Sequence, residues 1–261
     1  MVWFMLVKLL VCLIAGLGAG IGTGLAGLSA AAVISPMLIT FLGVDPYEAV
    51  GISLASDVLA SAISAWTYHK NKNLDVKNGL LMMVSVLLFT LVGSYLGSLV
   101  PKSTMGGFSM FMTLLVGVKF IVRPVMTTRE SMAQRDPKQM AVKSILGGVV
   151  IGLICGFVGA GGGMMMLLVL VSVLGYELKT AVGTSVFIMT FTALTGAVSH
   201  FAIGSGVTDL SILAMCVAFT LLGAWLSAKF ANVASAKALN RATGVVLCAL
   251  GVFMIVFQYV L

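Results

Sequence analysis

The residues best suited to chemistry in this chain are a few hydroxyls, glycines and one carboxylate, set among long apolar stretches. The pattern Ala-Val-Gly-x-Ser occurs twice and ends at Ser53 and at Ser185. A hydroxyl one turn into a membrane helix can bond its own backbone, which is the default interpretation. The pattern recurs, each time after a break that contains glycine, and this recurrence favours a second role. We expect Ser53, Thr184 and Ser185 to contact a substrate.

Two glycine-rich turns precede short helical segments. Residues 159–163 hold four glycines in five positions, and the counterpart in the first half, residues 27–31, contains Ser29. Glycine leaves main-chain amide groups bare, and a helix N-terminus carries partial positive charge, which suits an anion. We therefore predict substrate contacts at Ser29, Gly161 and Gly162. The alternative is a tight helical hairpin that binds nothing.

Asp57 is the one acidic residue well inside a predicted helix. A carboxylate at that depth is costly and is a functional candidate by default, so we predict that Asp57 carries a proton. The matching position in the second half is Met189, so the role would be one-sided. A protonated or capping Asp57 with a purely structural role is the alternative. A metal site is not expected, since His69 and His200 each lack a second ligand nearby.

The composition defines the class of protein that must position these groups. Only 9% of the 261 residues are charged, 60% are apolar, and the mean hydropathy is +1.16. Continuous apolar stretches such as 80–100, 142–158 and 242–261 are long enough to cross a bilayer and do not alternate as barrel strands would. The sequence predicts an all-α integral membrane protein. We interpret the net charge of +7 as the basic bias of cytoplasmic loops rather than as a nucleic-acid surface.

The chain also carries an internal duplication. Residues 16–54 align without a gap on residues 148–186, with eleven of 39 positions identical, six of them glycine. Glycines at every fourth position in both copies (Gly16, Gly20, Gly24, Gly148, Gly152 and Gly156) are predicted to let helices pack closely. A duplicated apolar chain is typical of a transporter built from two repeats, with its site where they meet.

Breaks in the apolar pattern predict about ten helical segments, five in each half, of which 30–43 and 164–175 are short. If every segment crosses, twelve basic residues share one side and only Lys8 and Lys102 lie opposite; eight crossings would split the charges nine to five. The positive-inside rule favours ten crossings. Both termini are then non-cytoplasmic and the second repeat is inverted. The predicted division is a first repeat at 1–126, a cytoplasmic linker at 127–141 and a second repeat at 142–261.

The paired glycine turns, the twin Ala-Val-Gly-x-Ser segments and the duplicated layout with a polar linker resemble the sulfite exporter TauE/SafE family of permeases. The resemblance implies a secondary transporter, an exporter of small sulfur-containing or organic anions such as sulfite, sulfonates or sulfoacetate, in the plasma (inner) membrane. In that family a proline often follows the glycine turn. Pro36 fills this place in the first half, whereas Leu168 stands there in the second.

The main alternative is a proton-coupled cation or metal-ion carrier that uses Asp57 and the methionines at 164–166. An enzyme is not expected, because no nucleophile–base pair or metal cluster is evident. The expected partners are a small anion and membrane lipid, with no nucleic acid and no cofactor. The sequence leaves the anion, the direction of transport, the coupling ion and the oligomeric state open.

Overall fold

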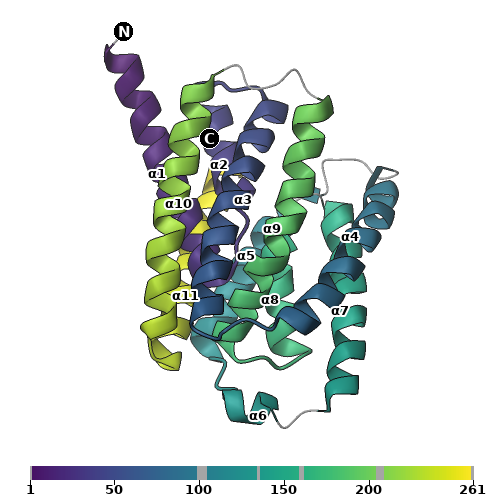
Figure 1. Ribbon diagram of the computed structural model, residues 1–261. Helices are drawn as coiled ribbons and strands as arrows, with labels where there is room; N and C mark the ends of the chain where they lie inside the picture. Colours follow the sequence, from purple (N-terminus) through teal and green to yellow (C-terminus); the bar gives the residue numbers. More distant parts are fainter. Residues whose placement is uncertain (1, 99–104, 134–135, 159–161, 204–208, 260–261) are drawn as a thin grey trace.

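The computed structural model (Figure 1) describes residues 2–98, 105–133, 136–158, 162–203 and 209–259. These residues form eleven helices and no strand. The helices are α1 (Val2–Ala26), α2 (Ala31–Leu42), α3 (Pro46–Lys70), α4 (Val76–Ser98), α5 (Met105–Val122), α6 (Arg129–Ala133), α7 (Pro137–Val158), α8 (Gly162–Ser172), α9 (Leu178–Ile203), α10 (Leu210–Val233) and α11 (Ala236–Tyr259). The predicted all-helical class is confirmed.

Seven helices in the described part of the chain are long and apolar enough to cross a membrane: α1, α3, α4, α7, α9, α10 and α11. The two predicted short segments appear as α2, with 12 residues, and α8, with 11. At 1.5 Å of rise per residue these helices extend about 18 and about 16 Å, well under the roughly 30 Å of a hydrocarbon core. The count of ten crossings therefore stays a prediction.

The duplicated sequence produces the same local backbone at the ends of the two short helices. Gly43 follows α2 with φ of 63°, and Gly175, at the matching position, follows α8 with φ of 64°. In each copy the next residue donates its N–H to the matching carbonyl, that of Leu38 or of Leu170. Glycine occupies these positions because left-handed backbone is strained for other residues.

Glycines bring two pairs of long helices into close contact. A Cβ added to Gly20 of α1 would lie 2.3 Å from the Thr220 carbonyl oxygen of α10. On the other side of the bundle, a Cβ on Gly152 of α7 would lie 2.7 Å from the Val86 carbonyl oxygen of α4. Both distances are too short for a real side chain, so the helices approach through bare Cα atoms.

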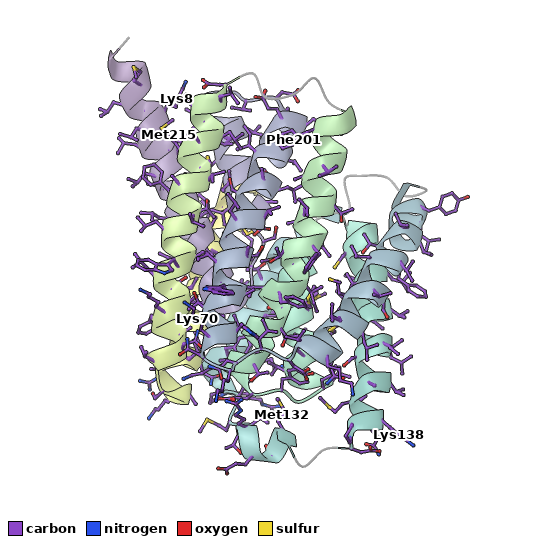
Figure 2. All side chains as sticks on the ribbon, in the orientation of Figure 1. Lys8, Lys70, Met132, Lys138, Phe201 and Met215 are labelled. Carbon is purple, nitrogen blue, oxygen red and sulfur yellow. The ribbon has the colours of Figure 1, made fainter. Side chains whose placement is uncertain are left out.

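Basic side chains lie toward opposite ends of the bundle. Figure 2 shows Lys8 near the top, whereas Lys70 lies in the lower half and Lys138 lies near the bottom. The N-terminus is also at the top of Figure 1, and α6, in the polar segment between the halves, is at the bottom. The predicted linker 127–141 contains α6 and the start of α7, which begins at Pro137. The domain boundaries themselves stay predictions.

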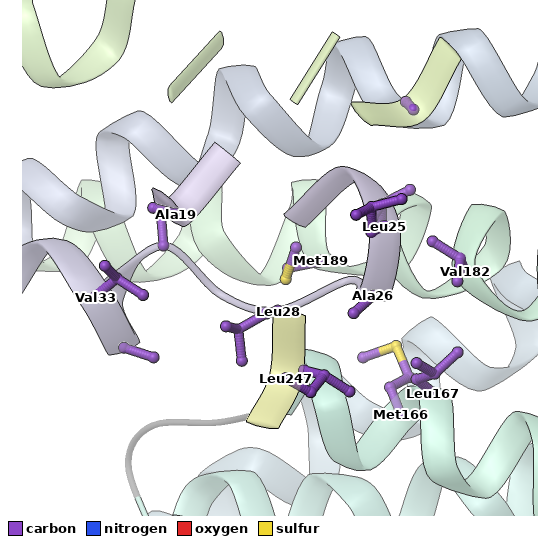
Figure 3. Packing of buried hydrophobic residues seen from close by; sticks show 14 of the residues in the cluster. Ala19, Leu25, Ala26, Leu28, Val33, Met166, Leu167, Val182, Met189 and Leu247 are labelled. Carbon is purple, nitrogen blue, oxygen red and sulfur yellow. The ribbon is translucent and has the colours of Figure 1, made fainter. Parts of the chain in front are cut away.

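The buried core lies where the α1–α2 connection meets α8 and α9 (Figure 3). Leu28 of the connection lies near Leu247 of α11, with Met166 and Leu167 of α8 and Met189 of α9 around it. These side chains are all under 4% exposed. The centre of the bundle is therefore built around an interruption between helices.

Candidate functional site

The interruption between α1 and α2, residues 27–30, is the centre of the candidate site; we call it the α1–α2 break. Gly27 adopts left-handed backbone, with φ of 63°, and its N–H donates to the Thr23 carbonyl at 2.8 Å. This hydrogen bond closes the αL motif that ends many helices. The chain then passes Leu28 and Ser29 and enters α2 at Ala31 without a side-chain cap.

Hydroxyls from three helices satisfy the carbonyls that the break leaves open. Tyr68 of α3 donates to the Gly24 carbonyl at 2.8 Å, and Thr243 of α11 donates to the Leu25 carbonyl at 3.2 Å. Thr23 reaches forward to the Leu28 carbonyl at 2.8 Å. Unpaired carbonyls are costly in an apolar interior, so these bonds hold the irregular backbone in place. Sequence reasoning missed the bonds of Tyr68 and Thr243, because no local pattern links residues 44 and 218 positions apart.

The second half of the chain meets this break directly. A Cβ on Gly27 would lie 2.3 Å from the Ser185 hydroxyl oxygen of α9. A Cβ on Gly163, in the first turn of α8, would lie 2.0 Å from the Gly27 carbonyl oxygen and 2.8 Å from the Met189 sulfur. The break, the start of α8 and the Ser185 face of α9 therefore lie side by side. The hypothesis that each glycine turn faces the other half's Ala-Val-Gly-x-Ser segment fits Gly27 and Ser185.

The other predicted site residues do not all gather at the break. Ser53 donates to its own Ala49 carbonyl at 2.6 Å and bonds the Ser35 hydroxyl of α2 at 2.8 Å. The Thr184 hydroxyl accepts the N–H of Asp75 from the connection between α3 and α4, at 3.2 Å.

Of the two glycines predicted to contact substrate, Gly162 is the first residue of α8, and Gly161 lies outside the described residues. Substrate contacts at all the predicted positions stay predictions.

Asp57 is joined to the break through Ser29. The Ser29 hydroxyl donates to Asp57 Oδ2 at 2.6 Å, and the Asp57 residue is only 1% exposed. Asp57 Oδ1 has no hydrogen-bond partner among the described residues. The two residues were each singled out in the sequence, but nothing in the sequence indicated that they bond to each other.

An apolar groove of about 330 Å³ lies on the other face of α3 and α9. Its lining includes Trp66 and His69 of α3 with Phe187, Thr190 and Phe191 of α9. The lining is almost entirely apolar, which does not suit a charged solute. No three His, Cys, Asp or Glu side chains among the described residues are grouped to hold a metal ion.

The sequence of this chain also matches the model of a known family. The family model described as sulfite exporter TauE/SafE matches residues 12–254. This chain belongs to that family. The resemblance inferred from the glycine turns is confirmed, and the TauE/SafE protein is a membrane transporter, not an enzyme.

Relatives of this TauE/SafE protein are also named as membrane transporters. "Probable membrane transporter protein YunE" of Bacillus subtilis is 28% identical over 225 residues, which cover 78% of this chain and 80% of the relative. "Probable membrane transporter protein YdhB" of the same organism is 22% identical, over 80% of this chain and 84% of the relative. A "Probable membrane transporter protein" of Haemophilus influenzae is 27% identical, over 76% and 75%. No solved structure matches this TauE/SafE protein.

Proposed function

We propose that this chain is a secondary carrier, an exporter, of small sulfur-containing or organic anions such as sulfite, sulfonates or sulfoacetate. The observation that carries the proposal is the meeting of Gly27, Gly163 and Ser185 at the centre of the bundle. Broken helices that meet between two repeats are typical of transporter sites, and their N-terminal ends suit anions. The anion would be held at the break by main-chain N–H groups and by the hydroxyls of Ser29 and Ser185. To donate to it, the Ser29 hydroxyl would turn from Asp57 Oδ2, and the Ser185 hydroxyl would turn from the Val182 carbonyl, to which it donates at 2.8 Å.

Neutralisation by dipoles rather than by a full positive charge fits a carrier. Three lysines of the surrounding helices are engaged elsewhere: Lys119 donates to Ser172, Lys179 donates to the Asn232 carbonyl, and Lys229 lies over the Trp225 ring. A site without lysine or arginine gives modest affinity and fast release, which transport requires. The alternative of a cation or metal carrier is not favoured by the family or its relatives.

The packing of helices supports the further proposal of two inverted repeats of five helices. The duplication makes α1 to α5 the counterparts of α7 to α11, with α6 between them. The pair α1 with α10 then matches the pair α7 with α4, and both pairs are in close contact. In addition α3 packs against its own counterpart α9, and α5 packs against α11. A two-fold axis between α3 and α9 would generate this pattern. We propose in addition that the chain is a multi-pass protein of the plasma membrane with both termini non-cytoplasmic.

A thermal-shift screen of the purified chain tests the proposed substrate class. The panel is sulfite, sulfate, sulfoacetate, taurine and simple carboxylates. An anion at about a hundred times its dissociation constant should stabilise the protein by about 2.7 kcal/mol. Stabilisation by one of these anions is expected, and stabilisation by none contradicts the proposal.

Two single substitutions on α9 then test the place of binding. Ser185→Ala removes the hydroxyl that touches Gly27, and the anion-dependent shift in melting temperature should fall. The matched control is Thr190→Ala, whose hydroxyl bonds the Val186 carbonyl at 2.9 Å and lies on the apolar groove. Equal shifts in both variants would place the anion away from the break. Thr184→Ala, measured beside them, tests the other predicted hydroxyl of α9.

A further inference from the structure

We infer that Asp57 binds the proton that couples this transporter to a proton gradient, with Ser29 linking that proton to the anion at the α1–α2 break. The inference rests on the proposed function only for the anion. Proton binding by Asp57 is a separate property that can be measured without any substrate.

The two oxygens of Asp57 have unequal surroundings. Oδ2 accepts the Ser29 hydroxyl at 2.6 Å, whereas Oδ1 is buried and has no hydrogen-bond partner among the described residues. Ionised oxygens in an apolar interior are stable only when donors or cations surround them. Oδ1 is therefore the atom that takes up the proton. Only an O–H bond forms in this step, and the proton comes from and returns to water.

No described cation is placed to neutralise Asp57. Helix α3 packs against α1, α2, α9 and α10, and α2 carries no ionisable side chain. The ionisable groups of the other helices and of α3 itself are Lys8, Cys12, Tyr47, Glu48, Tyr68, His69, Lys70, Lys179, His200, Cys216 and Lys229, and the side chain of His200 lies outside the described part. Lys8 pairs with Asp209 near the N-terminal end of α1, and Lys70 lies over Trp66 at the end of α3. Tyr68 donates to the Gly24 carbonyl instead.

The hydrogen bond from Ser29 to Asp57 allows protonation of Asp57 to affect anion binding. A hydroxyl bonds an ionised carboxylate more strongly than a protonated one. When Asp57 takes up a proton, the Ser29 hydroxyl is released more easily and becomes available to donate to an anion at the break. Ser29 lies two residues from Gly27, which touches Ser185. Proton and anion therefore favour each other's binding, and by linkage the effect is reciprocal.

The second repeat carries no matching acid. Met189 occupies the position that matches Asp57, and its sulfur lies against Gly163 at the start of α8. Asp57 thus contacts the α1–α2 break through a polar group, whereas Met189 contacts the first turn of α8 through an apolar group. The transporter therefore has one proton site at its centre rather than a symmetric pair.

Infrared spectroscopy of the purified full chain, titrated across neutral pH, tests the proton site. The wild type should show a carbonyl band of a protonated, buried carboxylic acid, and Asp57→Asn should lose it. Asp45→Asn is the matched control, because Asp45 caps the same helix from an exposed position and asparagine caps equally well. Spectra of Asp57→Asn that equal those of the wild type at every pH would overturn the inference.

Proteoliposomes with a trapped pH dye and radiolabelled sulfoacetate test the coupling. Sulfoacetate is fully ionised near neutral pH, so any proton that moves with it is carried by the protein. The wild type should move protons and sulfoacetate together, and Asp57→Asn should abolish the proton movement that accompanies sulfoacetate. Ser29→Ala should keep the infrared band yet lose coupling.

The two proposals fail in different ways. Sulfoacetate flux in the wild type without proton movement overturns the coupling by Asp57 and leaves the anion carrier intact. An intact infrared band with no flux or stabilisation by any anion of the panel overturns the proposed substrate class and leaves the proton site intact.

Discussion

At the scale of single residues, Gly27 is required both by left-handed backbone and by a close neighbour, whereas Gly43 is required by left-handed backbone alone. Both have φ of 63°, but a Cβ on Gly27 would lie 2.3 Å from the Ser185 hydroxyl, whereas a Cβ on Gly43 meets nothing within 4 Å. Gly43→Ala should cost about 1–2 kcal/mol, from left-handed backbone alone. Gly27→Ala should cost more and should also reduce transport. Melting temperatures of the two purified variants give the comparison.

A double variant separates the clash from the backbone strain. Gly27→Ala with Ser185→Ala removes the hydroxyl oxygen and leaves the Ser185 Cβ at an ordinary 3.4 Å. Its stability should therefore return toward that of Gly43→Ala. Equal melting temperatures for Gly27→Ala and Gly43→Ala would show that the break tolerates a side chain against Ser185.

The pair of Lys8 and Asp209 predicts a specific pH dependence. The hydrogen bond from Lys8 lowers the pKa of the Asp209 carboxyl from 3.8 to about 2. A carboxyl whose pKa is lowered by folding adds stability above its unfolded value, and that stability is lost as the pH falls from about 4 toward 2. The Asp209 side chain is 35% exposed, so screening keeps the contribution under about 1 kcal/mol.

The measurement compares Asp209→Asn with the wild type. Asparagine should keep the helix cap that Asp209 makes to the Ser211 N–H, so the difference reports the ion pair. The difference in melting temperature should be small and constant above about pH 4 and should vanish toward pH 2. A difference that grows on acidification contradicts the assignment of the lowered pKa to Lys8.

At the scale of helices, the contact of α1 with α10 predicts opposite effects for two nearby glycines. A Cβ on Gly20 would lie 2.3 Å from the Thr220 carbonyl oxygen and 2.7 Å from the Ala224 nitrogen. Both are backbone atoms, so Gly20→Ala must push the helices apart. Gly18 faces elsewhere, with only a Val33 methyl at 3.9 Å. Gly18→Ala should stabilise, by up to about 1 kcal/mol of helix propensity.

The same comparison can be made in the other half. Gly152→Ala in α7 would meet the Val86 carbonyl of α4 at 2.7 Å, so it should lower the melting temperature as Gly20→Ala does. If Gly20→Ala and Gly152→Ala were as stable as Gly18→Ala, the inference that these helix pairs are in close contact through their glycines would be wrong.

The helices were predictable where their signals are local. Segments predicted at 30–43 and 164–175 correspond to α2 at 31–42 and α8 at 162–172, because glycines and the Asp45-Pro46 start mark their ends. The start of α7 was missed, although Asp136 caps it through the Lys138 N–H at 3.0 Å. Its first turns are polar and were assigned to the linker.

The site was predictable only as a set of separate residues. Asp57 and Ser29 stood out as a buried acid and a turn hydroxyl, but their bond joins residues 28 positions apart. Tyr68 and Thr243, which hold the carbonyls of the break, are 44 and 218 positions from their partners. Such pairs follow from how helices pack, and neither periodicity nor a motif encodes packing.

At the scale of the whole molecule, helix pairing places the site. The two glycine-mediated pairs, α1 with α10 and α4 with α7, leave α3 and α9 packed against each other between them. Asp57 and Ser185 belong to these two central helices, and the α1–α2 break reaches both. A movement of one helix pair relative to the other would therefore shift α3 and α9 together with Asp57 and Ser185. Such a movement could open the site first to one side of the membrane and then to the other, as alternating access requires.

Cysteine labelling tests the membrane arrangement that this mechanism needs. In a chain whose four native cysteines are replaced, Lys72→Cys, Lys138→Cys and Arg241→Cys give exposed thiols, and Leu210→Cys gives one at a position that is 71% exposed. If ten segments cross, the positive-inside rule puts the first three in the cytoplasm and Leu210 outside. An impermeant maleimide should then label Leu210→Cys in intact cells and label the other three only after permeabilisation. Eight crossings would instead put Lys72 and Arg241 on opposite sides of the membrane. The two halves would then not be inverted, and their helix interruptions could not face one anion.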